Sequence, residues 1–78
     1  MTDIANRKFC ESVKKILKAI NLTQKEFAAE IGMDLIRFNQ KLNNNCYASF
    51  SLSEMLIISR ELGESIEDMA TGNIDIDD

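Results

Sequence analysis

The chain has 78 residues, which is enough for one small domain with a modest core. It is 45% hydrophobic and 6% aromatic, contains no proline and shows no strand-like alternation, so we expect an all-α domain rather than a disordered chain. No stretch approaches the roughly 18 apolar residues that cross a bilayer, and the first residues lack the apolar core of a signal peptide. We therefore expect a cytoplasmic protein without membrane contacts.

Charge is unevenly distributed along the chain, whose net charge is -4. Residues 1–50 hold eight basic and five acidic side chains, whereas residues 51–78 hold one basic and eight acidic side chains. Binding responds to the local field rather than to the total charge, so the basic first part remains compatible with a polyanionic partner. The electrostatic signal for such a partner is small.

Apolar periodicity and capping signals predict five short helices, over residues 4–20, 24–31, 35–43, 52–62 and 66–70. The first helix carries an apolar stripe of Phe9, Val13, Ile16, Leu17 and Ile20. Further core candidates are Phe27, Ala28, Ile31, Phe38, Leu42, Leu52, Met55, Leu56 and Leu62. Helices this short are unstable alone, so they must be held together by packing around one core. We place the domain at residues 1–72, followed by an acidic tail at 73–78.

Three helices begin with a serine or threonine that an acid follows three residues later, which is the pattern of a capping box. The pairs are Thr23 with Glu26, Ser51 with Glu54, and Ser65 with Asp68. The third pair is the least typical, because Glu or Gln is preferred at the acid position. Asp34 is the expected N-cap of the third helix. Gly32 and Gly63 are expected in the left-handed conformation in which helices often end.

The two cysteines and the lack of histidine bear on metal sites and catalysis. Cys10 and Cys46 follow no metal-ligand spacing, so we expect reduced, partly buried thiols, no metal and no cofactor. We interpret the methionines as core filling rather than as a ligand set. Without histidine, a glycine-rich phosphate loop or paired carboxylates in a cleft, an enzyme is the least supported function.

Residues 23–43 have the layout of a capped helix, a glycine turn and a second short helix. Residues 22–44, LTQKEFAAEIGMDLIRFNQKLNN, resemble the helix-turn-helix of the Cro/phage-repressor (lambda-repressor-like, XRE-type) family, and look closest to small Cro-like regulators of phages and prophages. Residues 51–69 are similar to the fourth and fifth helices of that family. The resemblance implies a five-helix transcriptional regulator that binds a palindromic DNA operator as a homodimer, with its third helix in the major groove.

The resemblance also assigns candidate DNA contacts. It implies that Gln24 donates to a phosphate where the second helix meets the DNA backbone. The other expected contacts are Lys25, Asp34, Leu35, Ile36, Arg37, Asn39, Gln40, Lys41, Asn43 and Asn44. Among them, Arg37, Asn39 and Gln40 have the donors and acceptors that read guanine or adenine. Lysines and the 43–45 loop are suited to phosphates.

Apolar residues depart from the family pattern at the start of the third helix. Leu35 and Ile36 occupy positions where polar residues are usual, and contact with thymine methyl groups is their expected role. The alternative function is a protein-interaction module on the same fold, an antirepressor or partner-binding regulator. It would use this apolar tip or the acidic face, without specific DNA binding. Without the motif, exposed Arg, Asn and Gln side chains are more often a solvated face than a reading surface.

A homodimer is expected because one helix in one groove rarely supplies enough affinity or specificity. The candidate dimer surface is the fifth helix with the tail, which offers Ile66, Met69, Ile74 and Ile76. The simplest expectation for the tail is that it frays. Its alternation of isoleucine with aspartate also allows a short strand that pairs across a dimer.

Overall fold

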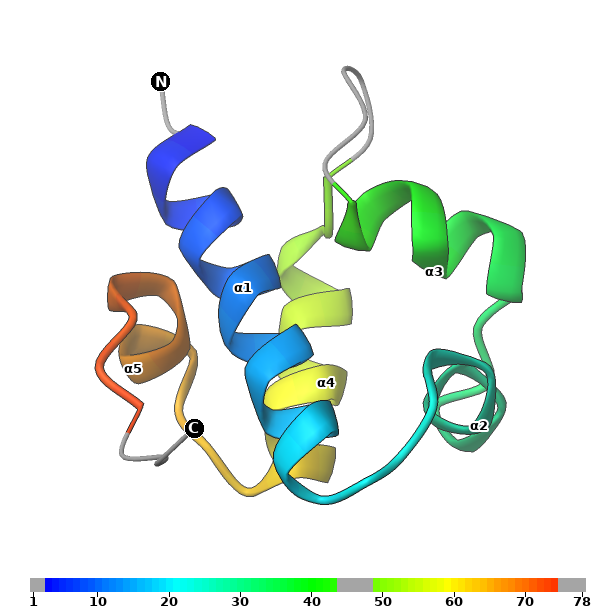
Figure 1. Cartoon of the computed structure of the whole chain (residues 1–78). Helices are drawn as coiled ribbons and strands as arrows, with labels where there is room; N and C mark the ends of the chain where they lie inside the picture. The colour runs from blue at the N-terminus through cyan, green and yellow to red at the C-terminus, as the bar shows by residue number, and fades with distance from the viewer. Residues whose placement is uncertain (1–2, 44–48, 75–78) are drawn as a thin grey trace.

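The computed structural model describes residues 3–43 and 49–74, with side chains from residue 6 onward. Within these ranges every regular element is helical: α1 (Asp3–Ala19), α2 (Gln24–Glu30), α3 (Leu35–Leu42), α4 (Leu52–Leu62) and α5 (Ile66–Thr71) (Figure 1). The predicted all-α class is confirmed, and each predicted helix end lies within one residue of the observed one. The predictions for the tail, fraying or a short strand, include residues outside the described ranges.

Side-chain caps begin four of the helices where the sequence predicts them. The Thr23 and Ser51 hydroxyls accept hydrogen bonds from the amides of Glu26 and Glu54, whose carboxylates accept from the cap amides in return. The Ser65 hydroxyl accepts from the amide of Asp68, but this cap is not a complete box. At the end of α4, Gly63 has φ 75°, which is the predicted left-handed conformation.

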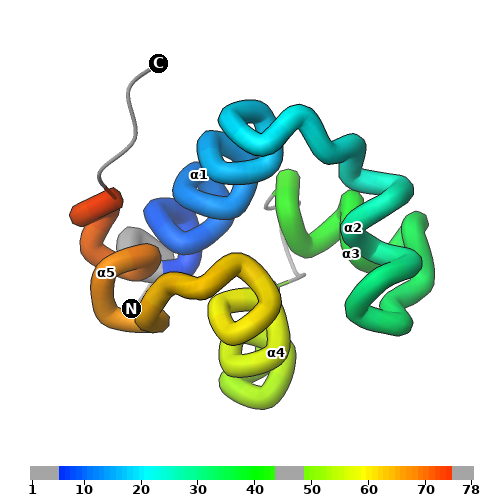
Figure 2. The backbone as a smooth tube through the Cα atoms, turned by 90° about the horizontal axis from the view of Figure 1, so that it is seen from below, coloured from blue at the N-terminus to red at the C-terminus, as the bar shows by residue number. Residues whose placement is uncertain are grey.

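Helix α1 lies in the middle of the molecule and organises the packing. It packs most extensively against α5 and also against α3, while α2 packs against α3 and α4 against α5. Figures 1 and 2 both show α5 on one side of α1 and the α2–α3 pair on the other. The pair is therefore held at one end of the domain, away from α5.

The four phenylalanines of the chain form a continuous aromatic row through the core. The ring of Phe38 in α3 lies 5.8 Å from that of Phe27 in α2 and 5.8 Å from that of Phe50, and Phe50 lies 5.9 Å from Phe9 in α1. All four rings are buried. Tilted and edge-on ring pairs at such distances add favourable contacts beyond the burial of their area. Phe50 was not among the core residues predicted from the sequence, so its place in the core is an addition to them.

The predicted core is right for α1, α2 and α3, but it is wrong at three positions. Ile20, Leu52 and Leu56 are exposed. Ile20 lies beyond the last residue of α1, in a turn where Asn21 has φ 60°, so the helical stripe has ended before it. Helix α4 buries Ile58 and leaves Leu52 and Leu56 exposed, while Met55 and Leu62 are partly buried against the core as predicted. Among the described helices none is long and apolar enough to span a membrane.

Candidate nucleic-acid interface

Helix α3 has one buried face and one solvated face. Phe38 and Leu42 are buried. On the opposite side Ile36, Arg37, Gln40 and Asn43 are exposed, at the spacing i, i+1, i+4 and i+7 that places side chains on one helical face. We call these four residues the α3 face. It presents a guanidinium, two carboxamides and one apolar side chain to a single side of the molecule.

The turn before α3 fixes where this helix starts. Gly32 has φ 72°, and the amide of Met33 donates to the Ala28 carbonyl at 2.9 Å, which closes the end of α2. Asp34 then caps α3 as predicted, because its carboxylate accepts from the amide of Arg37 at 3.1 Å. The carboxylate thus satisfies the helix start and lies where negative charge is favourable to the helix dipole.

Lys41 does not face solvent as a free cation, which corrects its expected role as a phosphate contact. Its ammonium group donates to both carboxylate oxygens of Glu54 in α4, at 2.8 and 2.7 Å, and both side chains are largely buried. Its backbone carbonyl also accepts from the Cys10 thiol at 3.3 Å. Lys41 therefore joins the end of α3 to α4 and to α1.

Glu54 carries out two structural tasks with one carboxylate. It accepts from the Ser51 amide at 2.8 Å to cap α4, and it pairs with Lys41. Burial alone would raise the pKa of this carboxyl, but the hydrogen bonds from Lys41 and Ser51 outweigh burial and leave the pKa below its ordinary value. The capping box was predicted from sequence, whereas the pairing with Lys41, 13 positions away, had no local signal.

Two other predicted contacts are less accessible than expected. Leu35 is half-buried and packs against the core, so the expected apolar tip consists of Ile36 alone. Asn39 is half-buried, and its carboxamide oxygen is enclosed without a hydrogen-bond partner in the described part of the chain. Both positions lie at the border between the buried and solvated faces of α3, where sequence spacing does not decide exposure.

The remaining predicted contacts lie in the first turn of α2 or outside the described residues. Lys25, in the first turn of α2, is exposed, and Gln24 beside it is half-buried. Asn44 lies outside the described residues. The pKa of Glu26 is lowered by the hydrogen bonds from the Thr23 amide and hydroxyl, so this carboxylate stays charged beside Lys25. Positive charge around the α3 face is therefore sparse.

The candidate dimer surface on α5 is not available as predicted. Met69 is fully buried, and its carbonyl accepts from the buried Ser12 hydroxyl of α1 at 2.8 Å. Ile74 is half-buried and packs against the core, and Ile66 is half-buried. Ile76 lies outside the described residues. Met69 thus serves the packing of α5 against α1 and is not free for a partner.

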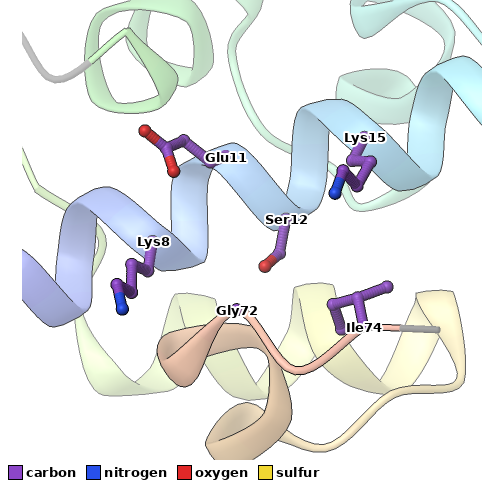
Figure 3. A pocket seen from close by; sticks show the side chains of 6 residues that line it. All are labelled: Lys8, Glu11, Ser12, Lys15, Gly72 and Ile74. Carbon is purple, nitrogen blue, oxygen red and sulfur yellow. The ribbon is translucent and has the colours of Figure 1, made fainter. Parts of the chain in front are cut away.

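A cavity of about 120 Å³ lies between α1 and the segment after α5, on the opposite side of the domain from α3. Figure 3 shows Ser12 pointing toward Gly72, Lys8 and Lys15 at the two ends, and Glu11 pointing away. The Ser12 hydroxyl is committed to the Met69 carbonyl. In the described chain no group of three or more His, Cys, Asp or Glu side chains could hold a metal ion.

The cysteine that the structure describes is a core residue. Cys10 is buried beside α3, and burial raises the pKa of its thiol to about 11, with Lys14 lowering it and Glu11 raising it by smaller amounts. A thiol with this pKa stays protonated and is a poor nucleophile at neutral pH.

Comparison of the chain with protein-family models, with curated proteins and with solved structures finds no match. The α3 face must therefore be interpreted from its own geometry and chemistry. Its exposed donors and acceptors stand on a helix whose other face is anchored by two buried side chains, and this is the arrangement that any rigid recognition helix requires.

Proposed function

We propose that the protein is a sequence-specific DNA-binding transcriptional regulator of the Cro or phage-repressor type. In this proposal α2 and α3 form a helix-turn-helix, with α2 crossing the DNA backbone and α3 in the major groove. The observation that carries it is the α3 face, where Arg37 and Gln40 are exposed one turn apart on a helix fixed by Phe38 and Leu42. An α-helix of this kind fits the width of the major groove.

The side chains of the α3 face have distinct proposed roles. Arg37 is suited to donate to O6 and N7 of guanine, and Gln40 to pair with N6 and N7 of adenine. Ile36 would contact a thymine methyl group. Lys25, Gln24 and Asn43 would contact phosphates and so set the register of the helix on the duplex. Lys41 and Asp34 have structural roles instead, as the α4 pair and the α3 cap.

A homodimer on a palindromic operator belongs to this proposal. Two copies double the set of base contacts and place one α3 in each of two successive major grooves. The scarcity of free positive charge near the α3 face predicts few phosphate contacts per copy. Because each contact adds about -0.9 to the slope of log affinity against log salt, we expect a shallow salt dependence for a regulator.

The direct test is selection of bound sequences from a pool of random duplexes, followed by footprinting of the selected site. We expect a short palindrome. Replacing Arg37 or Gln40 with Ala should then cost about 1–3 kcal/mol in binding and relax preference at one base pair per half-site. Lys8→Ala changes an exposed charge on α1 beside the segment after α5, on the opposite side of the domain from α3; it is the matched control and should leave the preference unchanged. A footprint retained by the double variant R37A/Q40A would contradict the proposal.

Two observations favour the second candidate, a protein-interaction module on the same fold. Ile36 exposes 67% of its surface at the start of α3, and Lys41 is paired with Glu54 instead of being free for phosphates. An exposed apolar side chain among polar neighbours suits a protein partner. Mixing the protein with duplex at low salt separates the candidates, since a DNA-binding face gives at least nonspecific binding and a dedicated protein-binding face gives none.

A further inference from the structure

Helix α4 carries apolar side chains on both of its faces. Its inner face buries Ile58 and Ser59. Its outer face exposes 67% of Leu52, 45% of Leu56 and 49% of Ile57. A cluster of exposed apolar side chains marks an interaction surface more often than scattered single ones do, and no other segment of the described chain covers this cluster.

The exposed apolar residues of α4 form one patch. Leu52 and Leu56 are one turn apart, Ile57 follows Leu56, and Ser53 between them contributes only a small hydroxyl side chain. We call these four residues the α4 face. Figure 2 shows α4 at the lower edge of the molecule, with α1, α2 and α3 above it. Elsewhere in the described chain, large exposed apolar residues occur singly, at Ile20 and Ile36.

We propose that the α4 face is the surface through which two copies of this chain pair. The inference rests on the homodimer of the proposed function and locates its interface, which the buried Met69 removes from α5. An apolar centre bordered by polar residues is the usual anatomy of such a contact, and here Arg60 and Glu61 form the border at the end of α4.

Charge selects the second copy as the occupant. A two-fold interface presents the same surface twice, so a face of one charge opposes itself. The exposed side of α1 is predominantly basic, with Arg7, Lys8, Lys14, Lys15 and Lys18 against Glu11. Helix α5 carries Glu67 and Asp68 and no basic residue. The α4 face is uncharged, and its border has one charge of each sign, so two copies meet there without like-charge opposition.

Pairing through α4 would also position the two recognition helices. Glu54 lies in the first turn of α4 and holds Lys41 at the end of α3 with two hydrogen bonds. Fixing one α4 against the other therefore fixes the separation of the two α3 faces and leaves both of them free. The four residues of the α4 face are few compared with the roughly 20–30 residues that each partner contributes to a standard interface, so the dimer is expected to dissociate on dilution.

Sedimentation equilibrium without nucleic acid tests the interface, from micromolar to millimolar protein. We expect reversible dimerisation of the wild-type chain. Dimerisation should be at least about tenfold weaker for Leu56→Lys and for Ile57→Lys, because each places charge in the patch. Ile36→Lys and Ile20→Lys make the same change at exposed residues outside the α4 face and should dimerise as the wild type does. Circular dichroism verifies that each variant is helical.

The outcomes separate this inference from the proposed function. A wild-type chain that stays monomeric at millimolar concentration overturns the inference, as do dimers that survive Leu56→Lys and Ile57→Lys, or that Ile36→Lys weakens equally. Footprinting on a single half-site is scored independently. Half-site protection by a monomeric Leu56→Lys variant supports both proposals, whereas a dimer that protects no duplex supports the α4 interface and removes the DNA-binding function.

Discussion

Helices α3 and α4 both expose apolar side chains, but they are built on different patterns. In α3 the buried Phe38 and Leu42 oppose polar residues, and Ile36 is the single large apolar residue on the solvated face. In α4 the buried Ile58 opposes a cluster of three exposed apolar residues. The first pattern suits a helix that binds a polar ligand such as DNA, and the second suits a helix that packs against another protein surface.

The largest expected effect comes from Phe38→Ala, which tests whether the aromatic row holds α3 in place. Phe38 is fully buried and its ring contacts both Phe27 and Phe50. Removing it should lower the free energy of unfolding by about 3–5 kcal/mol, through lost burial and the cavity left behind. Chemical denaturation followed by circular dichroism measures this. A loss below about 1 kcal/mol would mean that α3 is not anchored through this ring.

The fold was predictable where the signal is local, and the contrast between α3 and α4 shows the limit. Helix starts at Thr23, Asp34 and Ser51 follow from hydrogen bonds that span only three residues, so the sequence displays them directly. The inward side of α4 depends on which neighbour it packs against. Because its apolar residues are similar, spacing alone placed Leu52 and Leu56 inside and missed Ile58. The predictions for Met55 and Leu62, which pack against the core, were right.

The candidate site was predictable to the same extent. Arg37, Gln40 and Asn43 lie opposite Phe38, and helical periodicity is sufficient to expose them. The Lys41–Glu54 pair joins two helices across 13 positions, so its formation depends on tertiary packing. Asn39 and Leu35 lie at the edges of the solvated face, where a small rotation of the helix decides their burial.

A smaller effect is expected from Glu54→Gln, which asks whether α3 and α4 are coupled through charge. Glutamine still accepts from the Ser51 amide but cannot form the ion pair with Lys41. The pKa of Glu54 is lower in the folded protein than in the unfolded chain, so the charged carboxylate stabilises the fold. This stabilisation is present above the unfolded pKa of about 4.3 and is lost as pH falls through the folded pKa. At pH 7 the free energy of unfolding of the variant should be about 1 kcal/mol lower than that of the wild type, and this gap between the two proteins should close in acid.

Denaturation at a series of pH values measures the gap, with Glu61→Gln as the control. Glu61 is exposed on the same helix, and within the described residues no ion pair involves it, so its substitution removes the same charge without breaking a contact. A constant difference between Glu54→Gln and the wild type from pH 7 down to acid would show that charge is not the cause.

The smallest effect on stability is expected from two matched substitutions, Ile36→Ala and Leu52→Ala. Both side chains are about two-thirds exposed near the start of a helix, so each change should alter the free energy of unfolding by no more than about 0.5 kcal/mol in dilute protein.

The two substitutions should affect different binding reactions. Ile36→Ala should weaken duplex binding and leave dimerisation unchanged, because its side chain lies on the α3 face. Leu52→Ala should weaken dimerisation and leave the binding of a single half-site unchanged. Measuring both quantities for both variants decides whether the two helices have separate partners. If either substitution alters both quantities equally, the α3 and α4 faces form one continuous binding surface, and the division of roles between them is wrong.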